Sequence, residues 1–347
     1  MIKNIQDHII QQSEPILEAL RKLNCLPKTL TLFALNEKNQ MVGSLTDGDV
    51  RRGFLNDKTL NDQVSEFITK DFHYLDKTID VHYIKELKEK RIRLLPFLNA
   101  NKEILKVYEL YRLKSVLPLD AVIMAGGRGE RLRPVTDTIP KSLIKLGNKP
   151  IIEHTIDHLI LFGVENIYIS VNYLKDQIKD YLGDGSEKGI KITYVEEEKA
   201  LGTAGALSLV KNLKNDILLI NSDLFTNIDY EDLYLAYLKN QAQMAVASVP
   251  YSVSIPYAIL EEKENSVINF KEKPTNTHYA NAGIYLIKKE IINNIPKNVF
   301  YNATDLMNDL IGQNKKIIQN PIIGYWIDIG KHEDLKKAKE IINHLNE

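Results

Sequence analysis

From about Leu119 onward, short apolar runs alternate with amphipathic stretches, and this alternation restricts the fold more than any other feature of the chain. The runs "DAVIM", "NIYISV", "KITYV" and "DILLIN" have the length and composition of buried strands. The stretches between them, such as "IIEHTIDHLILFG" with its stop at Gly163, have helical periodicity. This pattern predicts an α/β fold in which a mostly parallel sheet carries helices on both faces. Ligands of such folds bind at the carboxyl ends of the strands.

The last third of the chain is richer in strands. The segments "MAVASVPY", "YAILEE", "SVINFKEK" and "AGIYLIK" are predicted strands, and "KHEDLKKAKEIINHLNE" is a predicted closing helix. We expect these strands to add an antiparallel part, which makes the sheet mixed.

Residues 1–115 have a different pattern and are predicted to form a small α+β module ahead of a domain at 119–347. A helix capped by Ser13 is followed by the strands "LTLFALN" and "MVGSL" and by a helix at "DGDVRRGFLN". The order helix–strand–strand–helix then recurs, with "IDVHYIKELKEKR", "RLLPFLNA" and "ILKVYEL" in its second copy. The module is therefore predicted to be a weak internal duplication.

Charge and cysteine content restrict the cellular compartment and the kinds of binding partner that we expect. The chain has 45 Lys and Arg against 46 Asp and Glu, which argues against a nucleic-acid or membrane partner. The single cysteine, Cys25, excludes an internal disulfide, fits a reducing compartment and is predicted to be a buried thiol. Because the sequence has neither an apolar run of 18 residues nor an h-region at its start, we expect a cytoplasmic protein.

The first strand of the larger domain runs into a loop rich in glycine and arginine, "AGGRGERLRPVTDTIPKS" at 125–142. Glycines allow close backbone approach, and the cations indicate an anionic ligand. The loop is not a P-loop, because Lys141 follows Pro140 far from the glycines. It is not a dinucleotide fingerprint either, because Leu132 stands where the third glycine belongs, and this disfavours a dehydrogenase. A triphosphate whose charge shifts during reaction suits such a loop.

The same stretch resembles the signature of the sugar-1-phosphate nucleotidylyltransferases, also called nucleotide-sugar pyrophosphorylases. Their pattern is G-G-x-G-x-R-L-x-P-x-T-x-x-x-P-K followed by K-P. It is matched at every fixed position: Gly126, Gly127, Gly129, Arg131, Leu132, Pro134, Thr136, Pro140, Lys141, Lys149 and Pro150. The motifs "LGTAGAL", "NSDLF", "FKEKP", "NAGIYL" and "WIDIGKHEDL" also match in order, over about 119–345. The resemblance implies a Rossmann-like nucleotidyltransferase domain that converts an NTP and a sugar 1-phosphate into an NDP-sugar and pyrophosphate.

The resemblance also implies roles for particular residues. Lys141 matches the catalytic lysine that contacts the reacting phosphates, and Arg131 the arginine that holds the leaving pyrophosphate. Asp223 and Asp328 match a pair that holds Mg²⁺, an ion that takes one or two carboxylates plus phosphate oxygens. The implied nucleotide contacts are Ala125, Gly126, Gly127, Gly129, Gly202, Thr203 and Ala204.

Three further matches concern the sugar phosphate. Lys273 matches a lysine that meets its phosphate, and Glu272 and Asn281 match positions that touch sugar hydroxyls. The complete layout, with a duplicated module ahead of the transferase, resembles the glucosamine-1-phosphate guanylyltransferases of legionaminic acid biosynthesis. Glucosamine 1-phosphate is therefore the candidate sugar, and mannose and heptose 1-phosphates stay open.

One carboxylate indicates which nucleotide base the protein binds. Glu197 precedes "LGTAG", at a position that is typically Gln in relatives that bind thymine or uracil. A carboxylate offers only acceptors, and guanine presents two adjacent donors, so Glu197 favours GTP. CTP, UTP and dTTP stay open as alternatives.

The segment "MVGSLTDGDVRRGFL" resembles a CBS motif and makes residues 1–115 a predicted CBS-domain pair. Thr46 and Asp49 are the candidate ribose contacts of a regulatory nucleotide, and the alternative is that they only cap a helix. The second copy lacks both residue types. Because CBS pairs commonly stack, the module has either a regulatory or a dimerising role, and we expect a homo-oligomer.

A different class of function is a catalytically silent regulatory subunit that senses nucleotide-sugars. Such subunits usually lose the lysine or an aspartate. This chain keeps all of the phosphate-contacting and metal-holding residues that the resemblance implies, which favours an enzyme over a silent subunit. These residues are Arg131, Lys141, Asp223, Lys273 and Asp328.

Overall fold

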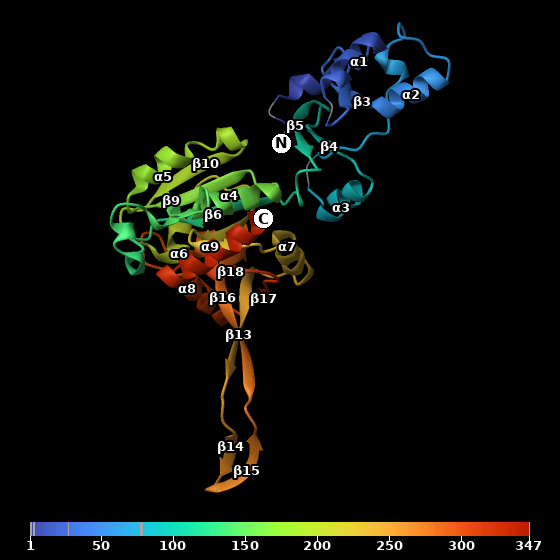
Figure 1. The fold of residues 1–347 in the computed structure, drawn as a ribbon. Helices are drawn as coiled ribbons and strands as arrows, with labels where there is room; N and C mark the ends of the chain where they lie inside the picture. Colours follow the sequence, from blue (N-terminus) through green and yellow to red (C-terminus); the bar gives the residue numbers. More distant parts are fainter. Residues whose placement is uncertain (1, 3, 27, 77–78, 347) are drawn as a thin grey trace. The chain divides into compact units, whose positions relative to one another are not determined.

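The computed structural model describes residues 2, 4–26, 28–76 and 79–346, and the chain divides into two compact units (Figure 1). The first unit is Met1–Pro118 with Leu161–Gly163, and the second is Leu119–Ile160 with Val164–Glu347. None of the helices within the described ranges is long and apolar enough to cross a membrane.

The first unit consists of two α+β lobes. The first lobe contains a sheet in the order β1-β2-β3 and comprises η1 (Ile5–His8), β1 (Ile9–Gln11), α1 (Ile16–Asn24), β2 (Thr31–Leu35), β3 (Met41–Thr46), α2 (Asp47–Leu55) and η2 (Val64–Glu66). The second lobe comprises α3 (Val81–Glu89), β4 (Leu94–Leu98) and β5 (Ile104–Glu109). Phe33 and Met41 share one apolar cluster with Leu94 and Val107, so the lobes pack against each other.

Three expectations for this unit are wrong in detail. Helix α1 is capped at Pro15, with no side-chain hydrogen bond, rather than by Ser13. Cys25 is exposed, because it lies at the C-terminal end of α1 beyond the last buried turn. No helix lies between β5 and β6 (Leu119–Met124) in the described chain, so the second copy of the repeat lacks its closing helix.

The second unit alternates strands and helices before it becomes richer in strands. After β6 its elements are η3 (Glu130–Leu132), η4 (Val135–Asp137), η5 (Lys141–Leu143), β7 (Lys145–Leu146), β8 (Lys149–Pro150), α4 (Ile151–Leu161), β9 (Asn166–Val171), α5 (Lys175–Leu182), η6 (Ser186–Lys188), β10 (Lys191–Glu196), α6 (Gly202–Gly205), η7 (Ala206–Leu209), β11 (Asp216–Asn221), β12 (Leu224–Thr226), α7 (Tyr230–Lys239), β13 (Met244–Ser254), β14 (Ile259–Lys263), β15 (Ser266–Lys271), β16 (Thr275–Ile287), η8 (Lys289–Asn294), α8 (Ala303–Gly312), β17 (Ile317–Pro321), β18 (Trp326–Asp328) and α9 (His332–Asn346).

Seven of these strands form the central sheet, in the order β10-β9-β6-β11-β16-β13-β17. Strands β10, β9, β6 and β11 are parallel neighbours, β13 and β17 are parallel to each other, and β16 is antiparallel to both of its neighbours. The mixed, mostly parallel sheet predicted from the sequence is confirmed. Its parallel half brings the loops after β6, β9, β10 and β11 to one edge.

One face of the sheet packs under α6, η8 and α8. Val122 and Leu219 of the strands share an apolar cluster with Ala204, Ile291 and Leu306 of these helices. The segment "GTAGALSLVKNL" forms only the short helix α6 and the 3-10 turn η7. Two backbone N–H groups of α6 donate to the Tyr301 carbonyl instead of continuing a helical ladder.

Strands β13 and β16 continue past the sheet as a long two-stranded extension that ends in the β14–β15 hairpin (Figure 1). We call residues 250–280 the arm. A bulge between Val246 and Ser248 marks its base, and the ladder then runs without interruption from Ser248–Asn281 to Ser254–Thr275. No described residue from 251 to 281 is buried.

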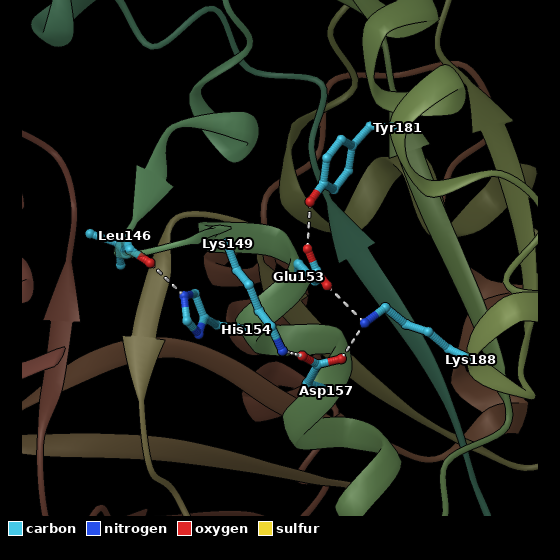
Figure 2. A network of polar contacts seen from close by, with 7 residues as sticks. All are labelled: Leu146, Lys149, Glu153, His154, Asp157, Tyr181 and Lys188. Atoms are coloured by element: carbon cyan, nitrogen blue, oxygen red, sulfur yellow. Dashed lines mark hydrogen bonds and ion pairs between the residues drawn. The ribbon is translucent and has the colours of Figure 1, made fainter. Parts of the chain in front are cut away.

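A network of ion pairs fixes α4, which begins directly after the Lys149-Pro150 motif (Figure 2). Asp157 accepts from Lys149 and from Lys188, both at 2.6 Å. Glu153 accepts from Lys188 at 2.8 Å and from the Tyr181 hydroxyl at 2.6 Å. Burial tends to raise the pKa of Asp157, but the lysine hydrogen bonds outweigh it and the pKa lies below its ordinary value.

Candidate active site

A cavity of about 610 Å³ opens at the carboxyl ends of the parallel strands of the second unit. Its walls come from the loop after β6, from Asn172 after β9, from Glu197 after β10 and from Asn221 to Asp223 at the end of β11. The cavity therefore lies at the edge of the sheet where an α/β fold places its ligands.

Glycine is required at two points of the loop after β6. Gly129 has φ 62°, and a Cβ there would lie 3.0 Å from the Cβ of Lys141. A Cβ on Gly126 would lie 3.0 Å from Oε1 of Glu197. At Gly127 a Cβ would meet nothing within 4 Å, so this stretch of backbone is open to a ligand in the cavity. These glycines therefore allow a ligand to approach the backbone closely, as the sequence predicts.

Lys141 lies between the two predicted metal ligands. Its ammonium donates a hydrogen bond to the Asp223 carboxylate, and its Nζ lies 3.9 Å from Oδ1 of Asp328. The pairing of β12 with β18 sets Leu224 opposite Asp328, and Ile329 N donates to the Asp223 carbonyl at 3.0 Å. This short antiparallel ladder holds the two carboxylates side by side although they are far apart in sequence.

Several oxygens around Lys141 have no hydrogen-bond partner among the described residues. They are buried atoms: Oδ1 of Asn221, Asp223 and Asp328, and Oγ of Ser142. A buried polar atom without a partner is costly and points to a missing ligand. The described residues contain no cluster of three or more His, Cys, Asp or Glu that could enclose a metal. Two carboxylates with free oxygens suit Mg²⁺, which takes its other ligands from water and phosphate.

The pKa of Asp328 lies above its ordinary value. Burial is the largest cause, the neighbouring Asp223 carboxylate adds to it, and the cations Lys141 and Arg131 act in the opposite direction. A cation bound between the two carboxylates would favour the ionised form of Asp328.

Two arginines of the loop flank the cavity. Arg131 lies against the chain that follows β18, where a Cβ on Gly330 would come within 3.0 Å of its guanidinium nitrogen. The Arg128 guanidinium lies 5.6 Å from the centre of the Tyr173 ring. Both arginines line the cavity together with Lys141.

Glu197, the predicted base contact, lines the same cavity. Its Oε1 accepts from the Ser170 hydroxyl, and its Oε2 accepts from Leu201 N at 2.9 Å. Asn172 Nδ2 donates to the Glu197 carbonyl at 2.5 Å. Because a carboxylate oxygen has two lone pairs, each oxygen keeps an acceptor site while the side chain is held in place.

The residues of the "LGTAG" segment differ in whether they line the cavity. Gly202 and Thr203 line the cavity, and Gly202 has φ 75° with no room for a Cβ beside the Tyr301 carbonyl. Ala204 is fully buried in the sheet core, and its N–H donates to the Tyr301 carbonyl at 3.0 Å. Ala125 is buried at the cavity wall, where its N–H donates to Ser170 O at 2.9 Å.

The predicted sugar-phosphate residues are not gathered at the cavity. Glu272 and Lys273 lie in the exposed arm, and Lys273 has φ 42°. Asn281 lies at the base of the arm, where its amide donates to the Tyr285 hydroxyl at 2.8 Å and its Oδ1 accepts from Gly283 N at 2.9 Å. None of the three lines the cavity of its own chain.

In the first unit, Thr46 and Asp49 form a capping box at the start of α2. The Asp49 carboxylate also accepts from the Thr69 hydroxyl at 2.9 Å and from the Arg52 guanidinium. Thr46 and Asp49 nevertheless line a cavity of about 520 Å³ between the two lobes, together with Arg51 and Arg93. Thr46 and Asp49 thus cap a helix, as one alternative expected. The other alternative, nucleotide binding, stays open because the cavity beside them has the size of a nucleotide.

Sequence reasoning assigned no role to several residues that line the large cavity: Ser142, Asn172, Asn221, Phe300 and Gly330. Asn221 and Gly330 lie inside the quoted "NSDLF" and "WIDIG" motifs, so a signal for them existed. Phe300 comes from the loop before α8, and no motif marks it.

Residues 120–344 match the protein family described as "Nucleotidyl transferase". The "Bifunctional protein GlmU" of Methanocaldococcus jannaschii is 33% identical over 237 residues, which are 66% of this chain and 55% of that protein. The "Mannose-1-phosphate guanyltransferase" of Yarrowia lipolytica is 30% identical over 228 residues, 62% of each chain. This chain therefore spans 55% and 62% of the length of these two curated relatives.

Two solved structures of related proteins are also similar to this chain. A Bacillus anthracis protein described as a glucose-1-phosphate thymidylyltransferase, in complex with sucrose, aligns with a TM-score of 0.52 and 27% identity. That alignment covers 64% of this chain and 94% of the other. HddC from Yersinia pseudotuberculosis, complexed with GMP-PN, aligns with a TM-score of 0.50 and 26% identity over 64% of this chain and 99% of its own. From the matched residues and the cavity that they build, we conclude that this chain belongs to the nucleotidyl transferase family.

Proposed function

We propose that the protein transfers a nucleoside monophosphate from an NTP to a sugar 1-phosphate and releases pyrophosphate. The observation that carries this proposal is the position of Lys141 between Asp223 and Asp328, beside the open backbone of a glycine loop. Cations, free carboxylate oxygens and accessible N–H groups in one cavity suit two phosphate-bearing substrates.

The chemistry is an in-line exchange at the α-phosphorus. An oxygen of the sugar phosphate forms a P–O bond as the bond to pyrophosphate breaks, and the electron pair leaves with pyrophosphate. Arg131 neutralises the leaving group, and Lys141 stabilises the charge on the reacting phosphate. Asp223 and Asp328 would hold Mg²⁺, which supplies charge neutralisation at the phosphate oxygens.

We favour GTP as the nucleotide. Glu197 is fixed by Ser170 and Leu201 and presents only acceptors, which suit the N1–H and 2-amino donors of guanine. The guanyltransferase of Yarrowia lipolytica and HddC with its GMP-PN are similar to this chain. For the sugar, glucosamine 1-phosphate is our candidate, because a small module ahead of the transferase resembles the layout of that enzyme class.

A pyrophosphate-release screen tests this proposal. Four NTPs are each combined with glucosamine, mannose and heptose 1-phosphates, with Mg²⁺ present. We expect release with GTP and a sugar phosphate, and loss of release with EDTA or with Asp223→Asn. Asp180→Asn on the exposed surface is the matched control. Absence of release from every pair would contradict the enzyme and leave the nucleotide-sugar sensor as the alternative.

A second candidate function concerns the first unit. Its cavity of about 520 Å³ carries Arg51, Arg91 and Arg93, whose charges suit a phosphate, and Thr46 and Asp49 line the same cavity. We propose that a regulatory nucleotide binds there. Titration of the full chain with AMP, ATP and GDP by calorimetry tests it, with Arg93→Ala as the variant. Binding that Arg93→Ala does not weaken would contradict this assignment.

A further inference from the structure

The loop after β6 has little internal structure of its own. Residues 126–131 line the cavity, and residues 132–138 form the outer part of the loop, with the 3-10 turns η3 and η4 as the regular elements between them. The structure describes every residue from 126 to 138, and among these only Leu132 and Thr136 are buried. Segments with so few buried contacts open easily, so contacts from outside the loop decide how well it keeps its shape.

Tyr173, which follows β9, contacts the outer part of this loop. Its hydroxyl lies 3.1 Å from the Thr136 carbonyl and 3.1 Å from the Asp137 carbonyl, so one hydroxyl proton is shared between two acceptors. The next carbonyl, that of Thr138, accepts from Gln177 Nε2 of α5 at 3.0 Å. Three successive carbonyls of the loop are therefore held by side chains of one neighbouring segment.

The same tyrosine also contacts the part of the loop that lines the cavity. Its N–H donates to the Gly126 carbonyl at 3.5 Å, and the Arg128 guanidinium lies over its ring, 5.6 Å from the ring centre. Tyr173 itself is not among the residues that line the cavity. It therefore holds the loop from outside the cavity and would act on a ligand only through the loop.

Thr136 connects the hydroxyl of Tyr173 to the centre of the cavity. The Thr136 hydroxyl donates to the Gly129 carbonyl at 2.9 Å. A Cβ on Gly129 would lie 3.1 Å from Cγ2 of Thr136 and 3.0 Å from the Cβ of Lys141, so these three residues pack without spare room. A displacement of Thr136 would therefore move the backbone of Gly129 against Lys141.

The turn that presents Tyr173 is strained. Leu174, the residue between Tyr173 and α5, has φ 49° and ψ 35°, a left-handed conformation that is unfavourable for a residue with a Cβ. Such a conformation persists only where surrounding contacts hold it. The contacts of Tyr173 and Gln177 with the loop lie on either side of Leu174, so they hold the turn as well as the loop.

The carboxylate that we propose as the base contact is held by other groups. Glu197 accepts from the Ser170 hydroxyl and from Leu201 N, and neither donor belongs to the loop after β6. Loosening the loop should therefore weaken the binding of every NTP by a similar factor and leave the base preference unchanged.

We propose that Tyr173 is a positioning residue that holds the loop after β6 in the conformation in which it receives the triphosphate. This inference rests on the proposed transferase and adds to it a residue that does not touch the substrates. A loop that is already ordered in the free protein loses less conformational entropy when its ligand binds. Tyr173 therefore raises the affinity for the triphosphate without taking part in the bond exchange.

The variant Tyr173→Phe removes the hydroxyl and keeps the ring beside Arg128. Calorimetric titration with GTP and Mg²⁺, without a sugar phosphate, should give a Kd about three- to tenfold above that of the wild type. In turnover, the KM for the NTP should rise by a similar factor, while kcat changes by less than about twofold. Tyr173→Leu also removes the ring and should weaken binding further.

Tyr194→Phe is the matched control, because it also removes a hydroxyl that donates to a backbone carbonyl. That hydrogen bond, to Gly183 O at 2.7 Å, lies outside the cavity lining, so the Kd should stay at the wild-type value. A wild-type Kd for Tyr173→Phe, or a fall in kcat with an unchanged Kd, would overturn the proposal. A change in base preference in Tyr173→Phe would also count against it.

A second measurement requires no substrate. Trypsin cleaves after exposed basic residues of segments that open, and Arg128 and Arg131 of the loop are exposed. Because cleavage follows the population of the opened loop, it should be about three- to tenfold faster after these arginines in Tyr173→Phe than in the wild type or Tyr194→Phe. Mass spectrometry identifies the products.

The two measurements separate this inference from the transferase itself. Equal cleavage rates in the wild type and both tyrosine variants would overturn the role of Tyr173. A wild type that binds none of the four NTPs would refute the transferase instead, and the cleavage rates would still decide whether Tyr173 holds the loop.

Discussion

The ammonium of Lys141 donates a hydrogen bond to the carboxylate of Asp223, a residue 82 positions later in the chain. The same ammonium lies 3.9 Å from Asp328 Oδ1, and a buried oxygen of each aspartate, Oδ1, has no hydrogen-bond partner in the described structure. The lysine therefore offsets one of the two negative charges, and the pair keeps carboxylate oxygens that could bind a cation.

Replacing Lys141 with Ala should lower turnover by about 10² to 10³, because a preorganised charge at the reacting phosphate is lost. Steady-state pyrophosphate release measures it, with exposed Lys191→Ala as the control. Turnover within about twofold of wild type would remove Lys141 from the reaction.

Replacing Asp328 with Asn should stabilise the metal-free protein at pH 7. The native pKa of Asp328 is raised, so its contribution to stability is fully present below about pH 3.8 and is lost as the pH rises through the native pKa. Asn does not titrate, so the Asp328→Asn variant does not lose this stability as the pH rises. Urea unfolding in EDTA should therefore show Asp328→Asn above wild type at pH 7, with the gap closing as the pH falls. A gap that does not change with pH would contradict the linkage.

Replacing Glu197 with Gln should reduce the preference for GTP over the other NTPs by about tenfold or more, since one acceptor becomes a donor facing guanine. The kcat/KM for each of four NTPs measures it. Glu198→Gln, the exposed neighbour, is the matched control and should leave the preference unchanged. Equal discrimination in both variants would exclude Glu197 from base recognition.

Replacing Lys188 with Met should cost about 1–3 kcal/mol of unfolding free energy at pH 7, because two charged hydrogen-bond acceptors lose a donor. The pKa values of Glu153 and Asp157 are lowered and that of Lys188 is raised. The network therefore stabilises between roughly pH 5 and 10, and its contribution disappears as acid protonates the carboxylates.

Urea unfolding at pH 7 and at pH 3.5 measures this effect. The difference between wild type and Lys188→Met should shrink at the lower pH, and Lys191→Met should differ little from wild type at either. An undiminished difference at pH 3.5 would show that the loss comes from packing rather than charge.

The sequence determined the sheet and the position of its ligand edge. Alternating strands and helices can pack only as a largely parallel sheet, and that geometry brings the ends of β6 and β11 together. The glycines of the loop and the aspartates at strand ends were visible as local signals, because backbone approach and strand termination depend on nearby residues.

Only the tertiary structure decided which of these residues meet. The β12–β18 ladder joins Asp223 to Asp328, and no local pattern specifies that pairing. The structure alone also buries Ala204 in the core, brings Phe300 to the cavity and holds Glu272 and Lys273 away from it. Contacts between distant segments depend on how whole elements pack, and packing is a property of the folded chain rather than of any short stretch of it.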